Sequence, residues 1–140
     1  MLDYPITLTK DTNGTLLVGS PDFPELVTFG QDKEDAIHHA RDAFITAIGF
    51  RMKDRADVPP PSTKGRTRVS LPALVVFKVA LYRQMKAQGV GRAELARRLG
   101  WKLEQVARVL DPYHESKMSN MEMAFKAIGL EVDAKLRKAS

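Results

Sequence analysis

Glu104, Gln105 and Arg108 combine residue types and spacings that suit the reading of DNA bases. Spacings of three and four residues place them on one stripe of a helix. Gln can bind adenine and Arg can bind guanine through two hydrogen bonds each, and Glu can accept one from cytosine. Cations nearby suit phosphate contacts. The residues predicted to contact DNA are Arg92, Arg97, Arg98, Lys102, Leu103, Glu104, Gln105 and Arg108. The alternative is a helical bundle whose solvated face carries a Glu104–Arg108 ion pair.

Two short helices separated by a glycine would have to position these side chains. Residues 92–99 form the first, and Gly100 suits the left-handed conformation that ends a helix. The second follows Lys102 and ends at Asp111-Pro112. Gly91 and Lys102 fall at N-cap positions, where Ser or Thr would stabilise the helix better. Such a pair is typical of a helix-turn-helix. The side chains predicted to face inward are Leu95, Ala96 and Leu99 in the first helix and Leu103, Val106, Ala107 and Leu110 in the second.

Longer helices are predicted on both sides of this pair. The helix after Pro72 has an apolar face and stops at residues 88–91. Ser119 and Glu122 form a capping box that predicts the start of the last helix. Trp101 is expected to pack into the core. The apolar candidates are Leu74, Phe77, Leu81 and Met85 in the earlier helix and Met123, Phe125, Ala127 and Ile128 in the later one.

The N-terminal half has a different pattern. Residues 4–9, 15–20 and 26–30 read as short strands, and Asn13-Gly14 suits a tight hairpin. Asp32 can cap a helix whose apolar positions recur at three and four residues. Its predicted face is Ile37, Ala40, Phe44, Ala47 and Ile48. We therefore predict an acidic domain over residues 1–60, a linker and short strand over 61–72, and a helical domain over 73–140. The proline-rich residues 57–65 are expected to make few contacts.

Charge divides the chain in the same way. Residues 1–60 hold ten acidic and six basic residues, whereas residues 61–140 hold seven acidic and sixteen basic ones. The basic half favours a polyanion and the acidic half a basic partner. No Cys is present, which excludes disulfides and fits a reducing cytosol. The longest apolar run, residues 73–77, is far too short for a membrane span. We therefore expect a cytoplasmic protein that does not contact membranes.

The titratable residues do not indicate an enzyme. Two-metal nuclease chemistry needs several carboxylates that converge on the metal ions. Nothing in the spacing of Asp3, Asp11, Asp22 and Glu25 suggests convergence. The adjacent His38 and His39 diverge by about 100° on a helix and cannot chelate one ion together. The sequence therefore predicts no catalytic residue, no metal site and no cofactor.

A family resemblance covers nearly the whole chain. Residues 78–112, "KVALYRQMKAQGVGRAELARRLGWKLEQVARVLDP", resemble the C-terminal helix-turn-helix of the HicB antitoxins. "YPITL" and "TLLVGSPDFPELVTFGQDKEDAIHHARDAF" resemble the N-terminal strands, Pro-Asp turn and Ala-rich helix of that family. "PPPS" and "RVSLPAL" resemble its segment between domains. Arg92 departs from the Gln that related repressors often carry there.

The resemblance implies an α+β protein: a small, partial RNase H-like domain with a β-sheet and a helix, then an all-α helix-turn-helix domain. HicB proteins pair with HicA, a small basic ribonuclease toxin, and their N-terminal domain covers the toxin's active surface. The C-terminal domain binds double-stranded operator DNA, here expected as a homodimer or tetramer. Two alternatives remain, a one-component repressor with a ligand-sensing N-terminal domain and a nuclease.

The expected toxin contact is the turn formed by Asp22, Phe23, Pro24 and Glu25. Two prolines hold this turn rigid, so that it loses little entropy on binding. For Phe23 the alternative is an inward position against Ile37 and Phe44.

Overall fold

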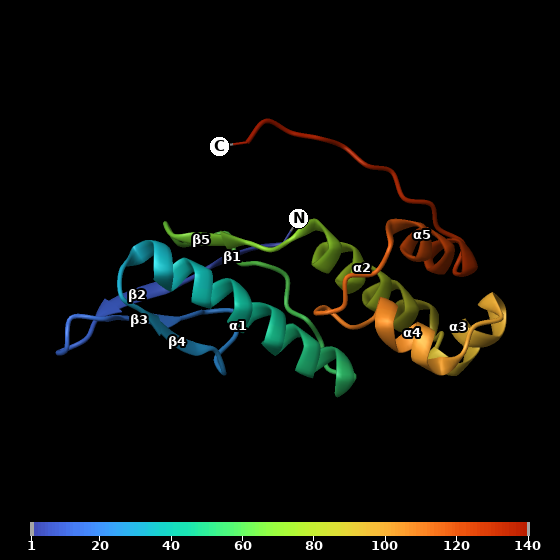
Figure 1. The fold of residues 1–140 in the computed structure, drawn as a ribbon, viewed down its shortest axis with the longest axis horizontal. Coiled ribbons are helices and arrows are strands. Elements are labelled where there is room, and N and C mark those ends of the chain that lie inside the picture. Colours follow the sequence, from blue (N-terminus) through green and yellow to red (C-terminus); the bar gives the residue numbers. More distant parts are fainter. Residues whose placement is uncertain (1, 140) are drawn as a thin grey trace.

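The computed structural model describes residues 2–139 and has two regions of different character (Figure 1). The first half contains strands and one long helix, and the second is mostly helical, so the α+β prediction is confirmed. The strands are β1 (Asp3–Pro5), β2 (Thr7–Lys10), β3 (Leu16–Gly19), β4 (Val27–Gly30) and β5 (Arg68–Ser70). The helices are α1 (Lys33–Lys53), α2 (Ala73–Gln88), α3 (Arg92–Leu99), α4 (Leu103–Val109) and α5 (Met118–Ala127).

The strands form two small antiparallel arrangements. β2, β3 and β4 make a three-stranded meander, in which Thr9 lies opposite Leu17 and Leu17 opposite Phe29. Gly14 has a positive φ of 86° in the turn between β2 and β3, as predicted, but Asn13 does not, and residues 11–15 form a longer connection than the tight hairpin that was expected. β1 pairs with β5, and the two partners are far apart in the chain. Only Ile6 separates β1 from β2, so one extended segment joins both arrangements.

Helix α1 lies across the three-stranded sheet (Figure 1). The Asp32 side chain accepts a hydrogen bond from the Asp35 backbone N–H at 2.8 Å, which confirms the predicted cap. The predicted face is buried except for Ile37, which is half-buried. Phe44 packs with Tyr4 and Phe23, and the three ring centroids lie 5.1–5.5 Å apart. This aromatic cluster joins β1, the turn before β4 and α1 into one core.

The segment between the two regions is held on both sides. Tyr82 donates a hydrogen bond to the Ala56 carbonyl at 2.6 Å, and Arg83 donates one to the Val58 carbonyl at 2.6 Å. From the other side, the Tyr4 hydroxyl donates to the Pro59 carbonyl at 2.6 Å. The expectation of few contacts is therefore wrong, because an extended proline-rich backbone leaves its carbonyls free to accept hydrogen bonds from both regions.

Three details of the helical region correct the sequence predictions. Leu103 is 59% exposed and Met123 is 46% exposed, so neither faces inward. Leu74 and Phe77 are only half-buried, while Val75, Lys78 and Val79 are buried. Helix α5 begins at Met118 after Lys117, and Ser119 and Glu122 form no capping box. Helices α4 and α5 have only two or three turns, which are too few for periodicity to fix which side faces the core. In α2, residues 73–77 are all apolar, so no single face stands out there.

Candidate DNA-contacting and partner-binding surfaces

A glycine sets the angle between α3 and α4. Gly100 is left-handed, with a φ of 68°, and Trp101 donates its backbone N–H to the Ala96 carbonyl at 3.0 Å. Both features end α3 as predicted. Gly91 and Lys102 occupy the N-cap positions of α3 and α4, and neither side chain caps its helix. Instead, the Gln105 side-chain oxygen accepts the Lys102 backbone N–H at 2.9 Å, which stabilises the start of α4.

The outer stripe of α4 is exposed and carries charge. Glu104 and Arg108 lie on it, with Gln105 between them in sequence. Within residues 2–139 no ion pair joins Glu104 to Arg108, so the alternative of an intrahelical pair has no support. Lys102 and Leu103 are exposed at the start of the same helix. Arg108 borders a small hollow of about 110 Å³. The residues that line this hollow are Trp101, Gln105, Arg108, Val109, His114, Ser116 and Asn120.

The arginines of α3 differ in whether their side chains already make hydrogen bonds within the chain. Glu94 accepts hydrogen bonds from Arg97 at 2.9 Å and from Arg98 at 3.0 Å. These bonds, chiefly that from Arg97, lower the pKa of Glu94 to about 2. Arg98 also donates to the Ala127 carbonyl at 3.1 Å and so ties α3 to the end of α5. Arg92 is exposed. Two of the four predicted phosphate contacts, Arg97 and Arg98, therefore already have partners within the chain.

Lys78 is a buried residue that is not among the predicted functional residues. It lies in the middle of α2 with no exposed surface. Its ammonium donates to the Arg108 carbonyl at 2.7 Å, the Asp111 carbonyl at 2.8 Å and the Ser116 hydroxyl at 2.8 Å. An ammonium has three protons, so all of its donors are satisfied. Burial lowers the pKa of Lys78 to about 8, while the Asp111 carboxylate opposes that shift.

These bonds attach the end of α4 to α2. Arg108 is the penultimate residue of α4, and its carbonyl is one of those that a helix C-terminus leaves without an intrahelical partner. A cation at that end also interacts favourably with the helix dipole. Ser116 donates to the same Arg108 carbonyl at 3.2 Å and is hydrogen-bonded to His114 at 3.0 Å. The orientation of α4 therefore depends on a charge that lies in α2.

The turn before β4 is clamped to its surroundings. Phe23 has no exposed surface and packs against Phe44, as the inward alternative expects, so its side chain offers no surface to a partner in this conformation. Arg51 lies over the Phe23 ring at 4.7 Å and holds Glu25 through two hydrogen bonds of 2.8 Å each. The Arg51 hydrogen bond lowers the pKa of Glu25. Asp22 accepts the Ser62 backbone N–H at 3.0 Å. Pro24 and Glu25 remain exposed.

One histidine of α1 is hydrogen-bonded to the sheet. His39 is hydrogen-bonded through its Nδ1 to the Phe29 carbonyl, and its Nε2 lies 3.6 Å from Asp35.

Among residues 2–139, no three His, Asp or Glu side chains are grouped so that they could hold a metal ion. In the same part of the chain, no helix has the length and apolar character needed to cross a lipid bilayer.

Comparisons with known proteins agree on one family. Residues 3–80 match the family described as the HicB-like antitoxin of bacterial toxin–antitoxin systems. The chain is 35% identical over 130 residues to Antitoxin HicB 2 of Photorhabdus laumondii, covering 93% of each protein. It is 32% identical over 131 residues to Antitoxin HicB of Escherichia coli K12, covering 92% of this chain and 95% of that protein. It is also 33% identical over 135 residues to Antitoxin HicB of Pseudomonas fluorescens, covering 94% and 92%.

Proposed function

The chain belongs to the HicB antitoxin family of bacterial toxin–antitoxin systems, and we propose that it both neutralises a toxin and represses transcription of its own operon. The family is non-enzymatic, so the chain is an antitoxin and not an enzyme. In this proposal the N-terminal region is a partial RNase H-like fold that binds a HicA-like ribonuclease. The C-terminal region is a helix-turn-helix that binds operator DNA, and both activities take place in the cytoplasm.

The exposed, unpaired stripe of α4 supports the DNA-binding part of the proposal. In a helix-turn-helix the second helix enters the major groove, and here α4 would be that recognition helix. Arg108 is the best placed residue for guanine, because its side chain makes no ion pair within the described residues. Gln105 must first release the Lys102 N–H before it can bind adenine through both of its amide atoms. Lys102 and Arg92 would then contact phosphates on either side.

Two substitutions on the recognition helix are expected to have different effects. Arg108→Ala should weaken binding to the operator by about 1–3 kcal/mol and relax the preference at one base pair per half-site. Lys102→Ala should weaken binding to all sequences alike and reduce the salt slope by about 1, because it removes one phosphate contact. We expect a palindromic operator with half-sites about one helical turn apart, bound by a dimer. Fluorescence anisotropy at several salt concentrations measures both effects.

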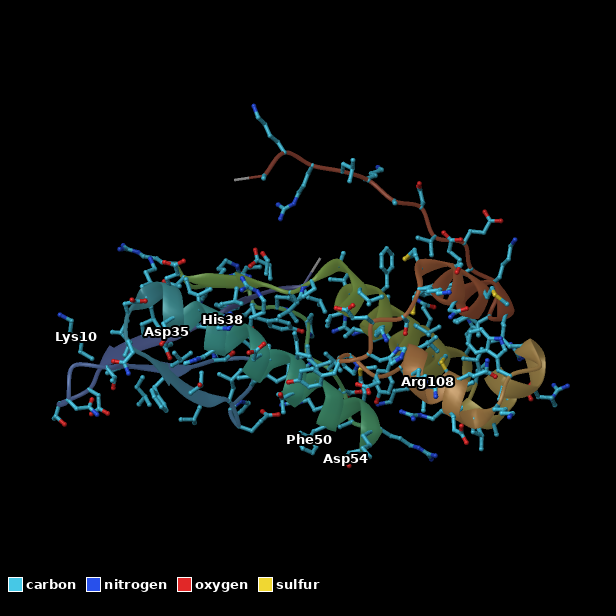
Figure 2. The ribbon with its side chains drawn as sticks, in the orientation of Figure 1. Lys10, Asp35, His38, Phe50, Asp54 and Arg108 are labelled. Atoms are coloured by element: carbon cyan, nitrogen blue, oxygen red, sulfur yellow. The ribbon has the colours of Figure 1, made fainter. Side chains whose placement is uncertain are left out.

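Lys10→Ala provides the matched control for these variants. Lys10 is exposed in β2, and Figure 2 shows it at the opposite end of the molecule from Arg108. This variant should bind the operator as the unmodified chain does. If Arg108→Glu left operator affinity intact, α4 would not be the recognition helix.

The acidic N-terminal region supports the toxin-binding part. It holds ten acidic against six basic residues, which complements a basic ribonuclease and mainly increases the association rate. Because Pro24 and Glu25 are exposed, the turn before β4 remains part of the proposed interface, with Asp22 beside them. Phe23 supports that turn from inside. The clamp by Arg51 keeps the turn preorganised, which reduces the entropy lost on binding.

The toxin-binding proposal is tested with the full chain and a HicA-like ribonuclease from the same genome. We expect a stable complex, complete inhibition of RNA cleavage at one antitoxin chain per toxin, and association that slows as salt screens the opposite charges. Stopped-flow fluorescence and an RNA cleavage assay measure these quantities. If the ribonuclease remained fully active in the presence of excess antitoxin, a one-component repressor would become the better explanation.

A further inference from the structure

The outer face of the three-stranded sheet is apolar and uncovered. Helix α1 packs on the opposite face, and three large side chains of the outer face are exposed: Leu17 by 44%, Val27 by 70% and Phe29 by 55%. The Phe29 ring also contacts the His39 ring of α1 edge-on, with centroids 6.3 Å apart. Leu17 and Phe29 lie directly opposite each other on β3 and β4. Val27 lies opposite Gly19, which has no side chain to shield it. The three residues therefore form one continuous patch, of the kind that marks an interaction site.

The edge of β4 beside this patch is also open. β4 pairs with β3 on one side, and no other strand within residues 2–139 pairs with it. The Phe29 carbonyl is hydrogen-bonded to His39 of α1, so it points away from β3. Backbone groups alternate along an antiparallel strand, so those of Val27 also point outward. An extended segment of another protein could therefore pair with Val27 and extend the sheet.

Charge around the sheet indicates what kind of protein covers it. Residues 7–35, which comprise the three strands, their connections and the start of α1, hold six acidic residues and two lysines. This imbalance attracts a basic partner. It also opposes pairing between two copies of the same face, because like charges would be brought together. The sheet face thus combines an apolar centre with a negative surround.

We propose that the outer face of β3 and β4, with the open edge of β4, is the main surface on which the ribonuclease toxin docks. This inference rests on the toxin-neutralising function proposed above. Leu17, Val27 and Phe29 form the apolar centre of the interface, and the clamped turn that contains Glu25 lies immediately before β4 at its rim. Central apolar side chains of this kind carry most of the binding energy of an interface, and charges at the rim mainly govern association.

The test uses the full chain with the double substitution Val27→Ser and Phe29→Ser. We expect the affinity for the isolated ribonuclease to fall by about tenfold to hundredfold, mostly through faster dissociation, because two central side chains lose their contacts. RNA cleavage should resume at toxin concentrations that the unmodified chain inhibits. Operator binding by the same variant should be unchanged, which shows that the chain is folded and that only one of its two activities is affected.

Phe50→Ser is the matched control. Phe50 is 65% exposed on α1, away from the sheet face, and its replacement should leave toxin affinity unchanged. If the unmodified chain inhibits the ribonuclease and the double variant does so equally well, the sheet face is not the docking surface, although the proposed function stands. If even the unmodified chain fails to bind, the proposed function itself is wrong. Loss of self-association in the double variant, with toxin binding intact, would instead assign this face to contacts between copies of the chain.

Discussion

A Lys78→Met variant is expected to lose operator binding by about thirtyfold to a hundredfold at a temperature where it remains folded. Methionine has a similar length but cannot donate to the Arg108 carbonyl, the Asp111 carbonyl or the Ser116 hydroxyl. Each acceptor keeps another partner, because the Arg108 and Asp111 carbonyls also accept the Asp111 and His114 backbone N–H groups and Ser116 is hydrogen-bonded to His114. Each lost bond therefore costs about 0.5–1.5 kcal/mol, partly offset because a charge no longer has to be buried. The end of α4 then loses its attachment to α2. We expect the melting temperature to fall by about 10 °C.

Leu81→Ala is the control for stability. Leu81 is also fully buried in α2, and its truncation should cost about 2–5 kcal/mol without removing a hydrogen bond from α4. Operator and non-specific DNA affinities of both variants are measured well below their melting temperatures. A selective loss of operator affinity in Lys78→Met alone supports a positioning role for Lys78. Equal operator affinities in the two variants would show that Lys78 acts only on stability.

The same substitution is expected to change how stability depends on pH. The folded pKa of Lys78, about 8, lies below its ordinary value of 10.5, so between these values the unfolded chain binds more protons. Stability from this group therefore increases as pH rises from about 8 toward 10 and is lost as pH falls through 8. Above pH 10, burial of Tyr4, whose pKa is raised to about 12, acts in the opposite direction. Thermal unfolding from pH 7 to 10 should show the increase in the unmodified chain and not in Lys78→Met.

Phe23→Ala is expected to reduce the free energy of unfolding by about 3–5 kcal/mol. Phe23 fills the space between Tyr4 and Phe44, with ring centroids 5.1 and 5.5 Å away, and Arg51 covers its remaining face. Removing the ring leaves a cavity that two prolines and the Arg51–Glu25 pair prevent the turn from filling. Urea unfolding measures the loss. Phe50→Ala, at an exposed position, should change stability by less than about 0.5 kcal/mol.

The result for Phe23 also separates the two roles that the sequence left open. A residue that only contacts a partner could be truncated at little cost to the free protein. A loss of less than about 1 kcal/mol would therefore contradict the core position. In that case the turn would have to collapse inward despite its clamp.

The parts of the fold that the sequence predicted well are those where one local signal decides the structure. In α1, apolar residues recur at three and four residues along the helix, so the buried positions of Ala40, Phe44 and Ile48 follow from periodicity. Gly100 ends α3 because the left-handed backbone conformation at that position strongly favours glycine. Asp32 caps α1 for an equally local reason.

The parts that were missed depend on contacts between distant segments. In β4, Val27 and Phe29 face outward and Thr28 faces the helix, which is the reverse of what apolar alternation predicts. Phe23 could not be placed, because prolines fix the backbone of its turn and leave open the side to which the ring points. Lys78 has a signal in the sequence, since it lies three residues before Leu81 on the predicted apolar face of its helix. A lysine there needs buried acceptors, and only the folded chain reveals which ones.

The pairing of β1 with β5 affects the order in which the antitoxin is completed during its synthesis. Tyr4 is opposite Val69, so β1 cannot pair with β5 until the ribosome has added a residue 65 positions later. At about 5–20 residues per second, the ribosome needs roughly 3–13 seconds to supply it. During that interval the N-terminal sheet lacks one of its neighbours, and the segment that holds Tyr4 from the other side is still being made. A nascent chain is therefore expected to bind its partner only after the strand that leads into α2 has emerged.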